Sequence, residues 1–290
     1  MMRWRDAIGT EHVRAPADAR IACLVPSITE LVCDLGLAAQ LVARTGFCIH
    51  PRATVAAIAK VGGTKDVDIA RLRALAPSHV IVNIDENNKP AVEEIARFVP
   101  HVIVTHPNAP EDNFDLYRLI GGIFDRAAAA EKLCNALRVA LAAALRDTAG
   151  LPRQNVLYLI WKEPWMTVAR DTYISRTLAA VGWDTVPAAA TATAAAARYP
   201  QLSPAALTQA AGAAGVVLLS TEPYMFRAPH VVALQAQLVA ALQAQLDAPP
   251  AAAPRVMLID GEMTSWYGSR AIAGLAYLGR LRAVSAARAS

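Results

Sequence analysis

The stretch that decides the fold is Arg20–Pro51, RIACLVPSITELVCDLGLAAQLVARTGFCIHP. Its apolar run Ile21–Val25 has the length of a buried strand and stops at Pro26. The tetrad Ser27–Glu30 (SITE) fits a capping box, and glycine is favoured just past a helix end, so we expect a helix that closes near Gly36. A second short strand and a polar loop follow. Open α/β sheets bind ligands at the carboxyl edge, where such strand-to-helix turns lie, so this stretch predicts where a site should be.

Bulk composition indicates a globular protein. The chain has 290 residues, 55% hydrophobic and 18% charged, which is enough for two compact lobes and too apolar for a disordered chain. The net charge is +4, but the lysines and arginines are scattered and do not alternate with aromatic residues. A nucleic-acid partner is therefore not indicated.

The first residues of the sequence and the cysteines indicate the cellular compartment of the protein. Residues 1–20 carry several charges and no apolar core of a signal peptide, which predicts a cytoplasmic protein as written, or a periplasmic one if an export signal was removed. Polar residues interrupt the apolar stretch Ile21–Ala43, so membrane insertion is not expected. The four cysteines lack metal-type spacing and are interpreted as reduced thiols.

Apolar triplets alternate with helical patterns in the first half. Val80–Val82 follows a helical pattern at Ile69–Leu75, and Val102–Val104 follows another at Pro90–Phe98. Short, continuous, β-branched runs are typical of strands that are covered on both faces. Their alternation with helices predicts a mostly parallel sheet.

A long helical pattern, Ala127–Asp147, separates two halves with the same plan. Leucines recur in it every four residues, and it contains no glycine or proline. The plan then repeats with strands at 156–160, 216–219 and 256–259 and a helix at 174–181 that should close at Gly182; 188–197 and 248–254 are interpreted as surface connections. The sequence thus predicts an α/β fold of two Rossmann-like lobes, 1–126 and 150–290, joined by one long helix at 127–149.

Residues just after the predicted strands are the candidates for ligand binding. They are Pro26, Ser27, Phe47, Cys48, His50 and Asn83 in the first lobe and Trp161, Trp165, Tyr224, Phe226, Glu262 and Trp266 in the second. This aromatic, mildly polar set suits a broad, flat ligand with amide or hydroxyl edges. In the alternative interpretation, Trp161 and Trp165 only close the end of the second core.

Two other site hypotheses use the same loops. His50, His106 and Glu222, together with Asp260 or Glu262, could form a metal site rich in nitrogen and oxygen ligands. Cys48 could be a nucleophile with His50 as its base, although side chains two residues apart usually point apart. The run Gly62–Lys65 (GGTK) lacks the glycine spacing of a phosphate loop, and we interpret it as a turn before a helix capped by Asp66 or Asp68.

Several motifs in order along the chain resemble one family. The runs are VPSITELVCDLGL, TGFCIHP, VGGTK, APSHVIVN, STEPYMF and DGEMTSWYG. Together with the long helix they resemble the helical-backbone substrate-binding proteins of ABC importers, and within that class the cobalamin-binding proteins. The resemblance implies a periplasmic-binding-protein-like fold and a monomer without catalytic activity or a required cofactor. Its ligand would be cobalamin or another corrinoid, a related tetrapyrrole or a metal chelate such as an iron–siderophore, and its possible partner an ABC permease.

The resemblance also implies roles for particular residues. Pro26, Ser27, Phe47, Asn83, Trp161, Trp165, Tyr224 and Trp266 would line a cleft between the lobes. Family members present an acidic residue on the outer tip of each lobe, but Lys89 stands near the first expected position and 230–245 contains no acid at all. A cytosolic relative of the transport proteins is therefore the second form of this hypothesis.

Overall fold

The computed structural model describes residues 2–187, 198–245 and 254–287, and the chain forms two compact units. Unit 1 comprises Met1–Pro107, Glu111–Val139 and Tyr267–Ala271. Unit 2 comprises Asn108–Pro110, Ala140–Trp266 and Ile272–Ser290. A five-residue segment from the last part of the chain therefore belongs to unit 1.

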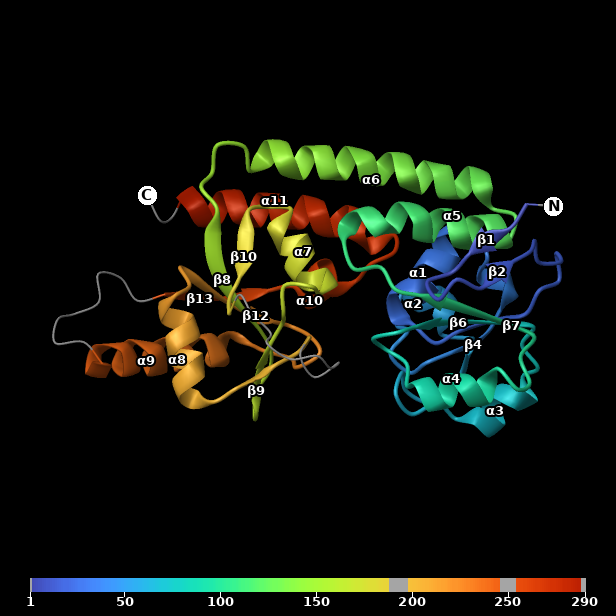
Figure 1. The fold of residues 1–290 in the computed structure, drawn as a ribbon, viewed down its shortest axis with the longest axis horizontal. Helices are drawn as coiled ribbons and strands as arrows, with labels where there is room; N and C mark the ends of the chain where they lie inside the picture. Colours follow the sequence, from blue (N-terminus) through green and yellow to red (C-terminus); the bar gives the residue numbers. More distant parts are fainter. Residues whose placement is uncertain (1, 188–197, 246–253, 288–290) are drawn as a thin grey trace. The chain divides into compact units, whose positions relative to one another are not determined.

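Unit 1 contains a five-stranded parallel sheet in the order β5-β4-β3-β6-β7. The strands are β3 (Ile21–Cys23), β4 (Leu41–Arg44), β5 (Ala59–Lys60), β6 (His79–Asn83) and β7 (His101–Thr105). Helices α3 (Ile69–Ala74) and α4 (Lys89–Ile95) cover one face, and α1 (Pro26–Asp34) and α5 (Asn113–Ile123) cover the other (Figure 1). The parallel sheet predicted for the first half is confirmed.

The start of α1 differs from the prediction. The helix begins at Pro26 after Val25, which caps it without any side-chain hydrogen bond, and Ser27 lies buried inside the first turn. Proline suits this first position because its fixed φ is already helical and its missing N–H costs nothing there. The capping-box prediction was wrong, whereas the predicted end is confirmed, since Gly36 follows the helix with φ of +76°.

Residues Trp4–His12 form a hairpin that covers the edge strand β7. Strands β1 (Trp4–Arg5) and β2 (Glu11–His12) pair antiparallel. The buried Asp6 carboxylate accepts from His12 Nε2 and from the backbone N–H of Val104, both at 3.1 Å. Trp4 lies so close to Gly122 of α5 that a Cβ at this glycine would overlap the indole ring. Nothing in the local sequence pattern predicted this hairpin.

Unit 2 contains a mixed six-stranded sheet in which β8, β10, β12 and β13 are parallel. Its strands are β8 (Gln154–Trp161), β9 (Trp165–Thr167), β10 (Trp183–Thr185), β11 (Gln201–Leu202), β12 (Val216–Ser220) and β13 (Arg255–Ile259). The short β9 and β11 are antiparallel additions, so the expected mostly parallel sheet is confirmed. As predicted, Gly182 follows a helix and has φ of +81°.

Helices cover both faces of the unit 2 sheet (Figure 1). Helices α8 (Pro204–Gly212) and α9 (Ala228–Gln245) lie on one side, and α7 (Tyr173–Ala179), α10 (Gly261–Ser265) and α11 (Arg270–Ala287) lie on the other. The core between the sheet and α8 and α9 includes Leu157, Leu219, Leu207 and Leu238. Residues 188–197 and most of 248–254, which were predicted to be connections, lie outside the described residues.

The long helix α6 spans Ala127–Asp147, as predicted, and contributes residues to both units. Its buried side is formed by Ala130, Cys134, Leu137, Ala140 and Ala144, while Leu145 is 63% exposed. A strict four-residue spacing drifts around a helix of 3.6 residues per turn, which explains why the leucine stripe does not stay buried. Within the described residues, no helix combines the length and the apolar character that crossing a membrane requires.

Candidate functional site

Large apolar side chains stand exposed at the carboxyl edge of the unit 1 sheet. Phe47 is 63% exposed, Ile49 48% and Ile84 46%. Phe47 and Ile49 lie in the loop after β4, and Ile84 directly follows β6. Gly46 N–H donates to the carbonyl of Gly62 at 2.7 Å, which ties the first of these loops to the neighbouring one. Large apolar side chains that are exposed together mark a surface that binds a ligand or a partner.

Cys48 lies buried beneath this loop. The hydroxyl oxygens of Thr29 and Thr45 lie 3.1 and 3.2 Å from its sulfur. Burial raises the pKa of the Cys48 thiol, so the nucleophilic thiolate is disfavoured at neutral pH. The side chain has no exposed surface, which argues against both the nucleophile hypothesis and direct ligand contact. Pro26 and Ser27 are also buried, and His50 is half-buried in the same loop.

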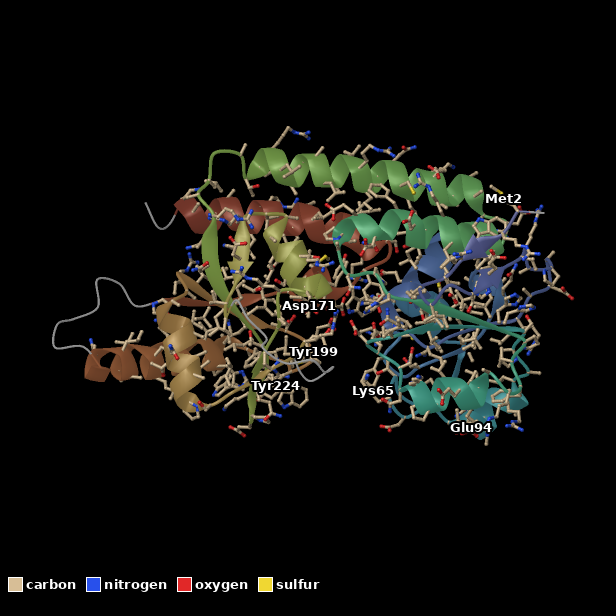
Figure 2. The ribbon with its side chains drawn as sticks, in the orientation of Figure 1. Met2, Lys65, Glu94, Asp171, Tyr199 and Tyr224 are labelled. Carbon is tan, nitrogen blue, oxygen red and sulfur yellow. The ribbon has the colours of Figure 1, made fainter. Side chains whose placement is uncertain are left out.

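Asn83 shapes the turn that follows β6. Its side-chain oxygen accepts from Asp85 N–H at 2.8 Å, and its own N–H donates to the side chain of Asn87 at 2.9 Å. Lys65, labelled in Figure 2, donates to the carbonyl of Asp85 at 2.7 Å, and His106 Nε2 lies 3.4 Å from the Asp85 carboxylate. Asn83 is 2% exposed, so its visible role is to hold this turn in place.

Tyr267 supports the same turn from a distant part of the chain. Its hydroxyl donates to the Glu86 carboxylate. Burial and the neighbouring Glu86 charge raise the pKa of Tyr267 well above its usual value, so the phenol stays protonated. Asn113 fixes the segment, since its side chain accepts from Gly268 N–H at 2.6 Å. Sequence reasoning missed Tyr267 and Glu86 as a pair, because 181 positions separate them and no local pattern connects them.

Aromatic side chains gather at the carboxyl edge of the unit 2 sheet. Trp161 is 39% exposed and meets the ring of Tyr224 edge-on at 5.5 Å. Tyr224, labelled in Figure 2, follows β12, as does Met225, which is 61% exposed. Phe226 is 1% exposed and stacks on Trp165, so it belongs to the core and not to the exposed surface. Among the predicted aromatic residues of this edge, Trp161 is thus exposed, Trp165 and Tyr224 are half-buried, and Phe226 is buried.

Glu222 is the acidic group of the unit 2 edge. Ser265 Oγ donates to its carboxylate at 2.8 Å, and the Trp266 indole also hydrogen-bonds to it. Burial raises the pKa of Glu222, and these hydrogen bonds oppose that rise. Gly261 is required beside it, because a Cβ there would overlap the Glu222 side chain. Trp266 itself is 8% exposed.

Three residues of the metal hypothesis, His106, Glu222 and Asp260, have other partners in their own units. His106 lies beside Asp85, and Glu222 accepts from Ser265. Asp260 caps α10 through a hydrogen bond from Met263 N–H at 3.1 Å, and the half-buried Glu262 lies in the first turn of that helix. Across the described parts of the chain, no three His, Cys, Asp or Glu side chains come together as metal ligands.

The fold is similar to solved structures of binding proteins. The periplasmic vitamin B12 binding protein BtuF of Vibrio cholerae is 17% identical, with 92% of this chain and 97% of that chain covered and a TM-score of 0.75. The periplasmic haem-binding protein RhuT of Roseiflexus is 20% identical, with 92% and 99% covered and a TM-score of 0.72. The periplasmic haem-binding protein HutB of Vibrio cholerae is 19% identical, with 91% and 98% covered and a TM-score of 0.68.

Sequence comparison agrees at the level of the family. No curated protein is significantly similar in sequence. The model of the periplasmic binding protein family matches residues 21–284, which leaves only the hairpin segment and the last residues outside the match. The chain therefore belongs to the periplasmic binding protein family.

Proposed function

We propose that this protein binds a broad, largely apolar small molecule of the corrinoid class and serves as the substrate-binding component of an ABC-type uptake system. The names of its structural relatives, which bind vitamin B12 or haem, support this ligand class. The proposed contacts are the exposed side chains of the two carboxyl edges, led by Phe47 and Trp161. The protein would act by binding and release, without making or breaking a bond.

The observation that carries the proposal is the exposure of large apolar groups where α/β sheets bind ligands. Phe47, Ile49, Ile84 and Met225 lie in loops that follow strands, and Trp161 is the last residue of β8. All five side chains are at least 39% exposed. Fully covering one such side chain is worth about 1.5–3 kcal/mol. Several of them together would supply enough free energy for micromolar binding, even after the cost of association.

A bare metal ion is less well supported as the ligand, because the described residues contain no cluster of protein ligands for one. A chelated metal needs no such cluster, since the chelator fills the coordination sphere. Iron–siderophore complexes therefore remain in the test as the second ligand class. By analogy with its family we propose a periplasmic location, and fractionation of the native cells tests it.

The test is titration of the full chain with cyanocobalamin, haemin and a ferric siderophore at micromolar protein, followed by calorimetry and absorbance. We expect saturable binding of cyanocobalamin, weakened about fivefold to tenfold by Phe47→Ala or Trp161→Ala. Val232→Ala is the matched control, because Val232 is a 70% exposed apolar residue that belongs to helix α9 and not to a loop after a strand. Absence of binding, or equal binding by all variants, would overturn the proposal.

A further inference from the structure

Three of the six histidines of the chain lie together in unit 1 and form what we call the histidine cluster. The rings of His79 on β6 and His101 on β7 stack with their centroids 4.5 Å apart. The third member is His12 on β2, which is 5% exposed, while His79 is 3% exposed. Burial, then the neighbouring His101 and His12, lower the pKa of His79 to about 4. The closed structure therefore resists a proton at a residue type that ordinarily titrates in mild acid.

The other groups around His79 come from the elements on its remaining sides. Phe124, at the end of α5, meets the His79 ring edge-on at 5.2 Å. Ser78 Oγ lies 2.9 Å from His79 Nδ1. At the start of β3, Arg20 directs its guanidinium to two backbone carbonyls that follow α3. None of these three groups is a carboxylate, so none of them favours a proton on His79 by its charge.

One carboxylate links the histidine cluster to the edge strand β7. Asp6 Oδ2 accepts hydrogen bonds from His12 Nε2 and from the backbone N–H of Val104, both at 3.1 Å. Asp6 Oδ1 accepts from two backbone N–H groups of the hairpin turn, at 3.1 and 2.9 Å. Ala7 N–H donates to the carbonyl of Val104 at 2.9 Å. The hairpin is thus bonded to β7 at Val104 by groups that lie next to the cluster.

The hairpin has far fewer partners than the strands behind it. Strands β1 and β2 have two residues each and pair with one another. Strand β6 pairs with β7 at five positions and with β3 at three, and its Val80 and Val82 belong to the core of unit 1. Local opening begins where the fewest buried contacts must break. Moving the hairpin therefore gives His79 access to water at a lower cost than separating β6 from the sheet.

We propose that the hairpin is an acid-released cover of β7, which opens when the histidine cluster takes up protons and before the parallel sheet of unit 1 unfolds. The usual pKa of histidine is 6.5, whereas that of His79 in the closed form is about 4. As pH falls between these values, the open form takes up a proton that the closed form does not, so opening becomes more favourable. The family match begins at residue 21, so this cover lies outside the part of the chain that matches the family.

Hydrogen–deuterium exchange of the full chain, measured by mass spectrometry at pH 7.5 and 4.5, tests the order of opening. Each rate is divided by that of an unstructured amide at the same pH, because chemical exchange itself slows in acid. We expect protection of the hairpin amides and of Val104 N–H to fall about tenfold or more between pH 7.5 and 4.5. At pH 4.5 the amides of β3 and β6 should remain about a hundredfold better protected than the hairpin. Hairpin protection that does not change with pH, or equal protection of hairpin and β6 at pH 4.5, would overturn the proposal.

Neutral variants identify the group that takes up the proton. In His79→Phe, which keeps a ring beside His101, and in His79→Gln, which keeps a polar group beside Ser78, the acid-induced fall in hairpin protection should shrink several-fold. His230→Phe is the matched control, because His230 belongs to α9 of unit 2, and it should leave the fall unchanged. Each variant is compared with itself at pH 7.5, so a packing defect that acts at both pH values cancels. A fall as large as that of the wild type in both His79 variants would overturn the assignment to this cluster, and the wild-type comparison decides the order of opening even where a variant fails to fold.

Discussion

Burial decides the chemistry of Cys48 at the scale of single residues. Its thiol has no exposed surface, and burial raises its pKa. We expect iodoacetamide at pH 7.5 to leave Cys48 unmodified in the folded protein over hours, because the thiolate is the reacting form and the sulfur is covered. Peptide mass spectrometry measures the modification. Complete reaction of all four cysteines after unfolding in urea is the control, and rapid labelling of Cys48 in the native protein would restore the enzyme hypothesis.

The candidate residues show how far sequence could predict the site. Strand-end positions were predictable, because apolar triplets mark the strands and the following residues must lie at one edge; Phe47 and Trp161 were found in this way. Exposure was not predictable, because Phe226 is 1% exposed although it stands only two residues from Tyr224 in the same loop. Which ring turns into the core depends on packing against α9, which no local pattern reports.

At the scale of elements, Glu30 in the middle of α1 pairs with a residue from the far end of the sequence. Arg270 donates two hydrogen bonds of 2.7 Å to the Glu30 carboxylate, and both side chains are largely buried. From the sequence alone we assigned Glu30 to a helix cap, because the SITE tetrad is a local pattern. The actual partner of Glu30, Arg270, lies 240 positions away. This pair explains why the capping-box prediction failed although the helix itself was predicted correctly.

The Glu30–Arg270 pair predicts a large effect on stability. Arg270→Ala should lower the free energy of unfolding by about 3 kcal/mol, because it leaves a mostly buried carboxylate without its partner. Urea denaturation followed by circular dichroism measures the change. Arg118→Ala is the control, since it breaks the solvent-exposed Arg118–Glu131 pair and should change the free energy of unfolding far less. Equal losses in the two variants would contradict the importance of the buried pair.

The amino-terminal ends of β6 and β7 predict a dependence of stability on pH. His79 stacks on His101 at 4.5 Å, lies near His12, which is paired with Asp6, and hydrogen-bonds with Ser78. Burial, then the two neighbouring histidines, lower the pKa of His79 to about 4. As pH falls from about 6.5 to 4, the unfolded chain takes up a proton that the folded chain does not, so stability should decrease across that window.

Denaturation midpoints measured between pH 7.5 and 4 test this expectation. The wild-type midpoint should fall through the window, and His79→Phe, which keeps an aromatic ring beside His101, should show a shallower fall. Measurements at pH 7.5, where His79 is neutral in both states, separate the packing effect of the substitution from the titration. Identical slopes for the two proteins would assign the pH dependence to other groups.

At the scale of the whole molecule, the repeated plan was predictable because each half contains the same order of strands and helices, closed by glycines at equivalent positions. Two features were not. The hairpin that covers β7 is held by Trp4 and by hydrogen bonds of Asp6, which are tertiary contacts. The segment Tyr267–Ala271 joins unit 1 through Asn113, Glu30 and Glu86, although the sequence around it belongs to unit 2.

The proposed function also leads to a test of stoichiometry. If Phe47 of unit 1 and Trp161 of unit 2 serve the same ligand, calorimetry should give one cyanocobalamin per chain, and either alanine variant should weaken that single event. Saturating ligand at a hundred times its Kd should then add about 2.7 kcal/mol to the stability of the wild type, and less in each variant because the same concentration is fewer multiples of their Kd. Two binding events, each weakened by only one of the variants, would mean that each unit binds its own ligand and that the edges work separately.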